Sequence, residues 1–273
     1  LPSKPKIFYG RYSELEDIIQ ILGKQLVRIA ILGGGGMGKT SLAKVVLHHP
    51  NTVAKFGQRF FVSAEAVTTS IELAALIALH VRLNPGKDLT KPVVQFFAQK
   101  SPSLLILDNL ETVWEPIQSG SGIEEFLSML TDIEHLTLII TMPGAERPAK
   151  VQWTHPFLAP LGPLSDEPAQ QKFMDITDNI DVNEDIHQIL MFTDNMPIAV
   201  NLIAHLSEYE GLSNVLTWWE TEKTALLSAG YDRRSNSDIS IGLSVSSPRI
   251  ISDSKELLKL LSILPDGLAD AEL

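Results

Sequence analysis

The chain has 273 residues, of which 44% are hydrophobic and 20% are charged, values that predict about two folded domains and exclude a long disordered tract. The net charge of −11 argues against nucleic acid and anionic membranes as partners, and the absence of cysteine excludes disulfides, thiolate catalysis and cysteine-based zinc sites. Because no apolar run reaches the ~20 residues that span a bilayer, and the first residues do not resemble a signal peptide, we expect a cytoplasmic protein with no nucleic acid and no membrane as partner.

The first part of the chain alternates helix and strand patterns. A helix is predicted to begin at Ser13-Glu14-Leu15-Glu16, which has the pattern of a capping box, and to end at Gly23. Apolar, branched runs typical of buried parallel strands lie at residues 26–32, 59–62, 103–107 and 136–141, with a weaker fifth at 155–161. Between these runs, apolar residues recur with the spacing of a helix at residues 41–47, 69–83, 90–100 and 123–132. This alternation predicts an α/β fold, a parallel sheet with helices on both faces.

Beyond about residue 165 the strand patterns stop. Helical spacing is found at residues 165–177, 183–193, 197–208 and 213–227, and a polar stretch at 231–238 has the composition of a linker. We therefore predict a sheet domain over residues 1–160, a small helical bundle over 161–230, and a linker with the start of a third unit over 231–273. Since the sequence begins without Met and stops at an apparent helix start, we expect further domains in the parent protein.

A glycine cluster follows the first predicted strand and matches G-x-x-x-x-G-K-[ST], the pattern of a phosphate-binding loop. Glycines let the backbone wrap an anion with N–H groups, and the next helix adds its positive partial charge. Lys39 would reach the β- and γ-phosphates, and Thr40 would bind Mg²⁺. The alternative is a glycine-rich turn, but the preceding strand and the following helix favour the loop. The predicted nucleotide-binding residues here are Gly33, Gly34, Gly35, Gly36, Met37, Gly38, Lys39, Thr40 and Ser41.

A second magnesium-organising acid is expected at the end of a buried strand, and Asp108 follows such a run. Its alternative is a turn or helix-capping aspartate. Hydrolysis also needs a group that orients or deprotonates water. Asn109 cannot accept a proton, so Glu111 is the candidate, although a solvated loop carboxylate is the alternative.

The next strand in the sequence ends at the same edge of the sheet. Thr141 could therefore face the γ-phosphate, while Arg147 or Lys150 approaches from the loop that follows, unless Arg147 is a surface arginine. The predicted catalytic residues are Lys39, Asp108, Glu111 and Arg147, and the predicted metal ligands are Thr40 and Asp108.

These residues resemble the NB-ARC branch of the STAND ATPases, the switch module of plant and fungal immune receptors and of apoptosome scaffolds, with wording most like basidiomycete fungal members. Phe8-Tyr9-Gly10-Arg11 is similar to the entry motif that lies against adenine and sugar. Residues 195–199 are similar to the GLPL motif, whose proline, here Pro197, packs on the adenine. The resemblance implies that Phe8, Tyr9, Gly10, Arg11 and Pro197 contact the nucleotide, and that residues 260–265 open a winged helix.

The resemblance implies a nucleotide switch, bound to ADP in its off state and to ATP with Mg²⁺ when it opens and forms a homo-oligomer. It also implies immune or cell-death signalling through effector and sensor domains. The chain departs from the family at Asn109, where a second acid is usual, and at Pro143, where an arginine sensor is usual. Both changes predict slow or absent hydrolysis. The alternatives are a degenerate interaction scaffold and a P-loop kinase.

Overall fold

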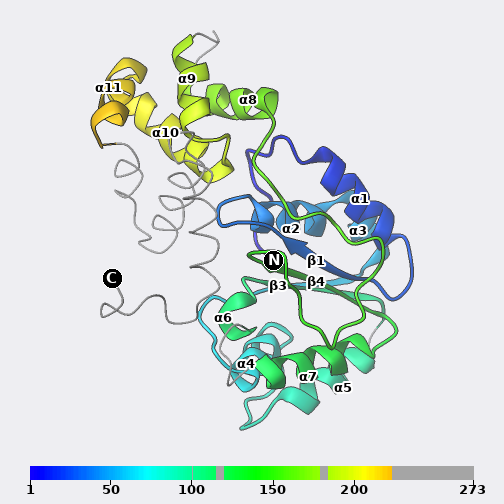
Figure 1. Ribbon diagram of the computed structural model, residues 1–273. Helices are drawn as coiled ribbons and strands as arrows, with labels where there is room; N and C mark the ends of the chain where they lie inside the picture. Colours follow the sequence, from blue (N-terminus) through cyan, green and yellow to red (C-terminus); the bar gives the residue numbers. More distant parts are fainter. Residues whose placement is uncertain (100, 115–119, 179–183, 223–273) are drawn as a thin grey trace, which may run out of the picture. The chain divides into compact units, whose positions relative to one another are not determined.

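The computed structural model describes residues 1–99, 101–114, 120–178 and 184–222, and the chain divides into two compact units, Leu1–Leu164 and Ser165–Leu273 (Figure 1). The first unit is built on a fully parallel sheet in the order β1-β4-β3-β2. Its strands are β1 (Arg28–Leu32), β2 (Gln58–Ser63), β3 (Ser103–Asp108) and β4 (Leu136–Met142). The predicted α/β fold with a parallel sheet is confirmed. The predicted linker and winged-helix start, residues 231–273, lie outside the described residues.

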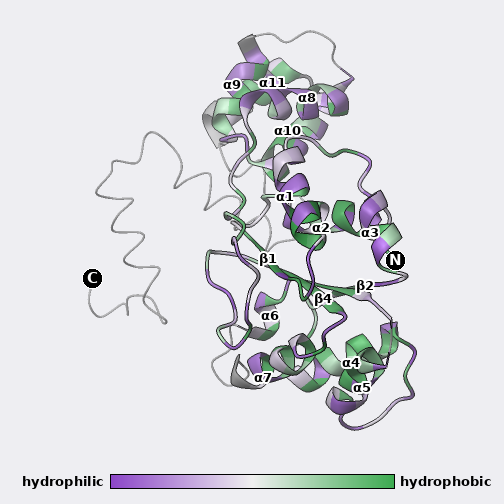
Figure 2. Ribbon diagram, turned by 90° about the vertical axis from the view of Figure 1, so that its right-hand side faces the viewer, coloured by the Kyte–Doolittle hydropathy of each residue, from purple (hydrophilic) through white to green (hydrophobic). Residues whose placement is uncertain are grey.

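Helices cover both faces of this sheet (Figure 2). Every residue of β3 is buried, and because side chains alternate along a strand, Leu104 and Ile106 enter one core while Leu105 and Leu107 enter the other. The first core is closed by α1 (Tyr12–Leu22), α2 (Lys39–His48) and the short α3 (Pro50–Lys55). The second is closed by α4 (Ser70–His80), α5 (Thr90–Ala98) and α7 (Gly120–Thr131). The sequence patterns missed α3 and the short α6 (Glu111–Trp114).

Two local predictions in this unit are wrong. The capping box at Ser13 is not formed, because α1 begins at Tyr12 with Arg11 as its N-cap, and the Ser13 hydroxyl donates to Glu14 instead. Residues 155–161 form no strand; within this described stretch only Leu161 makes a bridge, to Gly33. Prolines at 156 and 160 remove two of the N–H donors that a ladder would need. We call residues 151–164, which run along the outer edge of β1 up to the second unit, the connector.

The second unit is helical in its described part, with α8 (Asp166–Thr177), α9 (Glu184–Phe192), α10 (Pro197–Glu210) and α11 (Leu212–Glu222). Helices α8 and α10 form its main contact, and Phe192 stacks on Trp219 with ring centroids 5.6 Å apart. The ammonium of Lys172 on α8 donates to the carbonyl of Pro197, at 2.6 Å. Among the described residues of both units, no helix has the length and apolar character needed to cross a membrane.

Candidate nucleotide-binding site

The glycine loop joins the carboxyl end of β1 to the first turn of α2. Gly33, Gly36 and Gly38 have φ values of 142°, 72° and 90°, a region that glycine occupies without the strain of a Cβ. Gly38 is the N-cap of α2, so the loop ends directly on the helix. The first N–H groups of an α-helix have no partner within the helix, and they favour an anion at that end.

Lys39 lies inside this loop. Its ammonium donates to the carbonyls of Gly33, at 2.9 Å, and Gly34, at 2.8 Å, and the residue is only 9% exposed. Burial lowers the pKa of Lys39, while the negative charges of Glu111 and Asp108 oppose that change. Glu111, which begins α6, is partly buried.

Asp108, Thr40 and Thr141 form a hydrogen-bonded group at the carboxyl ends of the strands. The Thr40 hydroxyl lies 2.9 and 3.0 Å from the two carboxylate oxygens of Asp108. Thr141, which is fully buried on β4, donates to the Asp108 Oδ1 at 2.6 Å. The sequence suggested that Thr141 faces the γ-phosphate; its hydroxyl instead holds the Asp108 carboxylate toward Thr40. The pairing of β3 with β4 brings Asp108 and Thr141 together, and this strand order is not specified by the sequence.

The chain turns sharply after Asp108. Asn109 has φ 57°, a left-handed conformation that asparagine tolerates better than most residues. Its N–H donates to the Thr141 hydroxyl at 3.0 Å, and the N–H of Leu110 donates to the Thr141 carbonyl at 3.1 Å. These bonds fix the turn that leads from Asp108 to Glu111.

The site fits a magnesium nucleotide by the chemistry of its donors. Thr40 and Asp108 offer a hydroxyl and a carboxylate within one hydrogen bond of each other, which are oxygen ligands that Mg²⁺ accepts while it keeps water and phosphate oxygens. Within the described ranges no group of three or more His, Cys, Asp or Glu residues could hold a metal ion. A magnesium ion here would therefore depend on the phosphates for the rest of its coordination.

Removal of the Thr141 hydroxyl tests whether it supports this arrangement. In Thr141→Val the Asp108 carboxylate loses one donor and the partly buried Asn109 N–H loses its acceptor, so we expect Mg²⁺-ATP to bind about tenfold more weakly while ADP without Mg²⁺ is unaffected. Calorimetry with and without Mg²⁺ measures both affinities. Thr137→Val, also buried on β4 but at its opposite end, is the matched control. Equal Mg²⁺-ATP affinities for the two variants would contradict the expectation.

The predicted base-contacting residues are divided between the two units. Phe8, Tyr9 and Gly10 precede α1, where Gly10 has φ 67° and the Phe8 ring packs edge-on against Tyr12. Ser41 lies in the first turn of α2, partly exposed. Pro197 is buried as the first residue of α10 in the second unit, so its approach to the adenine stays a prediction.

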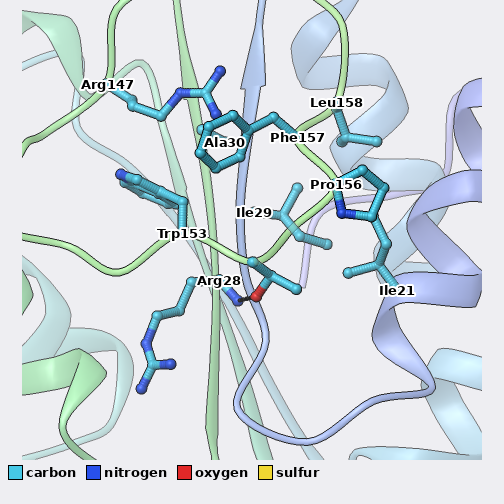
Figure 3. Close-up of a pocket in the computed structure, with 10 residues that line it drawn as sticks. Ile21, Arg28, Ile29, Ala30, Arg147, Trp153, Pro156, Phe157 and Leu158 are labelled. Carbon is cyan, nitrogen blue, oxygen red and sulfur yellow. Dashed lines mark hydrogen bonds between the residues drawn. The ribbon is translucent and has the colours of Figure 1, made fainter.

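Arg147 is not brought to the phosphate loop. Its guanidinium lies 4.0 Å from the ring centre of Phe157, and both residues line a pocket beside Arg28, Ile29 and Ala30 of β1 (Figure 3). No residue of the glycine loop lines this pocket. The sequence placed Arg147 at the γ-phosphate by its distance from β4 along the chain, but the connector attracts its side chain through a cation–π contact.

The fold is shared with known P-loop proteins at low sequence identity. The ORC1 protein of Aeropyrum pernix, in complex with DNA, aligns with a TM-score of 0.60 and 15% identity over 98% of this chain and 75% of that chain. A Walker-type ATPase of Pyrococcus abyssi aligns with a TM-score of 0.58 and 14% identity, over 96% of this chain and 91% of that one. A search of curated proteins found no match.

A structure of a signal transduction ATPase with numerous domains (STAND) that has a tetratricopeptide repeat sensor, from Pyrococcus horikoshii, is also similar. The TM-score is 0.52 with 19% identity, over 83% of this chain and 35% of that chain. The present chain thus spans about a third of the length of that protein.

The exclusion of nucleic acid as a partner is wrong. It rested on the net charge of −11, yet the ORC1 structure that has this fold is a complex with DNA. Overall charge describes the average surface, and a local patch can differ from it. A net negative charge therefore does not exclude nucleic acid for a chain of this fold.

A match between the sequence and a protein-family model identifies the family of the chain. The model of nSTAND1, described as Novel STAND NTPase 1, matches residues 2–147, a stretch that contains the glycine loop and Asp108 and exceeds half of the chain. The match supports the STAND class that the motifs suggested, while the NB-ARC branch and the fungal likeness are finer than the match and are not confirmed by it. The chain belongs to the nSTAND1 family of STAND P-loop NTPases.

Proposed function

We propose that the chain is a nucleotide-dependent switch of the NB-ARC kind, which binds ADP in its off state and ATP with Mg²⁺ in its on state. The observation that carries this proposal is the contact of Thr40 with Asp108 beside the buried Lys39 ammonium. An ammonium inside a glycine loop and an acid paired with a hydroxyl are the groups that bind a nucleotide polyphosphate and its metal. Membership of a STAND NTPase family supports the same function.

Slow turnover is part of the proposal. Asn109 supplies an amide where a second acid would accept a proton from water, and it is committed to the turn after Asp108. Glu111 is our candidate for the residue that orients water, because its charge acts on Lys39 from the start of α6. A magnesium ion, when bound, would screen the phosphate charge. Arg147 is not assigned to this step, because its guanidinium lies on the Phe157 ring.

We further propose that exchange of ADP for ATP favours an opened arrangement that oligomerises in the cytoplasm, with Pro197 as the adenine contact of the off state. A ligand shifts a conformational equilibrium only by the difference in its affinity for the two states. A role in immune or cell-death signalling rests on the NB-ARC resemblance alone.

Nucleotide retention tests the proposal. The purified protein is denatured and the released nucleotide is identified by ion-exchange chromatography. We expect ADP from the wild type, and a loss of about tenfold or more in ADP affinity for Lys39→Ala, because the variant removes the ammonium from the loop. Lys44→Ala, on the same helix with its ammonium near the Phe61 ring, is the control and should retain ADP.

Two outcomes would contradict the switch. A wild-type protein that releases no nucleotide and binds neither ADP nor ATP in calorimetry would have a vestigial loop, and the degenerate scaffold would then be the better interpretation. Nucleotide binding with identical small-angle scattering for ADP and a non-hydrolysable ATP analogue would remove the conformational part of the proposal.

A further inference from the structure

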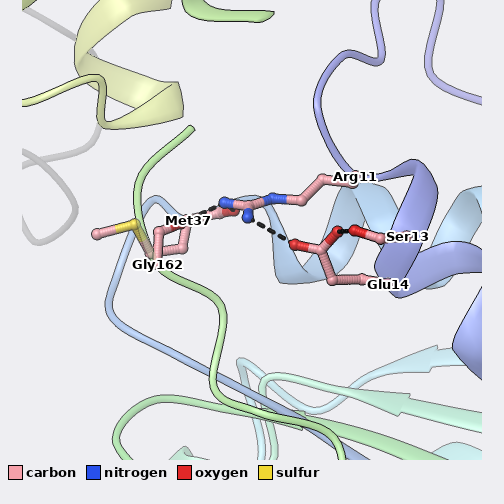
Figure 4. Close-up of polar contacts among 5 residues, drawn as sticks. All are labelled: Arg11, Ser13, Glu14, Met37 and Gly162. Atoms are coloured by element: carbon pink, nitrogen blue, oxygen red, sulfur yellow. Dashed lines mark hydrogen bonds and ion pairs between the residues drawn. The ribbon is translucent and has the colours of Figure 1, made fainter. Parts of the chain in front are cut away.

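Arg11 occupies a position that its predicted contact with the base does not explain. It is the N-cap of α1 and only 6% exposed. Its Nη2 donates to two main-chain carbonyls, that of Met37 in the glycine loop, at 3.2 Å, and that of Gly162 in the connector (Figure 4). Three segments that are distant in the sequence are therefore joined by one guanidinium.

The positive charge of Arg11 is balanced within the protein. Its Nη1 donates to the Glu14 Oε1 at 2.9 Å, and Ser13 donates to the other Glu14 oxygen at 2.8 Å (Figure 4). Burial opposes the charge of Glu14, but hydrogen bonds from Ser13, from its own N–H and from Arg11, together with the Arg11 charge, hold the pKa of this carboxyl below its ordinary value. The ion pair with Arg11 is thus maintained at neutral pH.

Two N–H donors of the guanidinium remain, one on Nε and one on Nη1, and the Nε donor does not face solvent. The Arg11 Nε is buried and has no hydrogen-bond partner among the described residues. Both N–H groups of Nη2 are used by main-chain carbonyls, so a nucleotide contact by this nitrogen would leave one of those carbonyls unpaired, which costs free energy.

The connector is attached to the phosphate loop at a second point. The Leu161 N–H donates to the Leu32 carbonyl at 2.7 Å, directly before Gly33. A Cβ on Gly33 would lie 2.5 Å from the Leu161 carbonyl oxygen, so only glycine permits this approach. Leu161 and Gly162 stand four and three residues before Ser165, respectively, where the second unit begins.

We propose that Arg11 is a positioning residue, which holds the Met37 turn of the phosphate loop against the connector through its two carbonyl contacts, and that it does not contact the base or sugar. A change in loop position then reaches the connector through the same guanidinium. The contacts themselves lie within the protein, so this inference depends on the proposed nucleotide binding only for its functional consequence.

Hydrogen exchange on the nucleotide-free protein tests the positioning role. In Arg11→Gln we expect peptides that cover residues 34–38 and 159–163 to exchange faster, while peptides from β2 keep the wild-type rate. Arg59→Gln is the control, because Arg59 also donates to a main-chain carbonyl, that of Leu47, at 3.4 Å. Unchanged exchange at both the loop and the connector would overturn the proposal, whether or not the protein binds nucleotide.

Ligand comparison separates positioning from base recognition. Competition against a fluorescent ADP analogue gives affinities for ADP and for inorganic pyrophosphate, which has neither base nor sugar. We expect Arg11→Gln to weaken both by the same factor, about tenfold, and Arg11→Lys to recover part of each, since lysine also donates to carbonyls. If Arg11→Gln weakened the binding of ADP but left the affinity for pyrophosphate unchanged, Arg11 would contact the base or sugar, and the inference would be overturned. If the wild-type protein bound neither ADP nor pyrophosphate, the proposed function would be refuted. The hydrogen-exchange result would then decide the positioning role of Arg11 by itself.

Discussion

Gly33→Ala is expected to destabilise the first unit by several kcal/mol, about 3 or more, and to abolish nucleotide retention. The added Cβ would lie 2.5 Å from the Leu161 carbonyl oxygen and 2.9 Å from its nitrogen, and both are main-chain atoms that cannot rotate away. Moving the connector breaks the bond from the Leu161 N–H to the Leu32 carbonyl. In addition, φ 142° is a strained value for alanine. Urea denaturation measures the change in the free energy of unfolding.

Alanine substitutions at two other glycines distinguish the effect of the steric clash on stability from the effect of backbone strain. Gly38→Ala has φ 90° but open space around the added Cβ, so it should show strain alone and cost about 1–2 kcal/mol. Gly57→Ala has open space and no positive φ, so its stability should lie within about 1 kcal/mol of the wild type. If Gly33→Ala unfolded at the same urea concentration as Gly57→Ala, the close approach of connector and loop would be refuted.

Lys172→Met is expected to stabilise the second unit at pH 7 and to remove a pH dependence that the wild type shows. Burial lowers the pKa of Lys172 from 10.5 to about 8 in the folded state. Between these two values the unfolded chain binds more protons, so the free energy of unfolding of the wild type rises with pH across this window. The full penalty on the charged lysine is present below pH 8 and amounts to at most about 3 kcal/mol. Loss of the bond to the Pro197 carbonyl offsets about 1 kcal/mol of the gain.

The measurement is a series of urea denaturations from pH 7 to pH 10.5 followed on tryptophan fluorescence, in a background where Trp114 and Trp153 of the first unit are replaced by Phe so that the signal comes from the second unit. The advantage of Lys172→Met over the wild type should shrink as the pH rises through about 8 and vanish before 10.5, where only the loss of the bond to Pro197 remains. Lys91→Met, at an exposed position of α5, is the control and should follow the wild type at every pH. A constant difference between Lys172→Met and the wild type would contradict the buried, charged lysine.

The sheet was predictable because its signals are local. An apolar run such as residues 103–107 fits only a strand that is buried on both faces, and β3 is that strand. The weak fifth run had the same apolar character, but Pro156 and Pro160 leave too few N–H groups for a ladder. The start of α1 was misjudged because Ser13-Glu14 has capping chemistry, whereas Arg11 takes the cap position through long-range bonds that no local pattern contains.

The candidate site was predictable only as far as its motifs reach. Lys39 and Thr40 follow from the loop pattern, and Asp108 follows from its place after a buried strand. The support that Thr141 gives Asp108 depends on strand register, and the turn at Asn109 depends on that support. A prediction from chain distance alone failed for Arg147, because the aromatic ring that its guanidinium meets comes from the connector.

The left-handed turn at Asn109 also limits which residues position 109 can tolerate. A glutamate at position 109, the most direct way to regain a proton-accepting second acid, would have to adopt φ near 57° and would cost about 1–2 kcal/mol. Relaxing the turn to spare that cost would break the Asn109 bond to Thr141 and so loosen Asp108. Replacement of Asn109 by an acid is therefore unfavourable whether or not the turn relaxes. An acid at position 109 would therefore require a second substitution at position 141 if the Asp108 carboxylate is to keep its place.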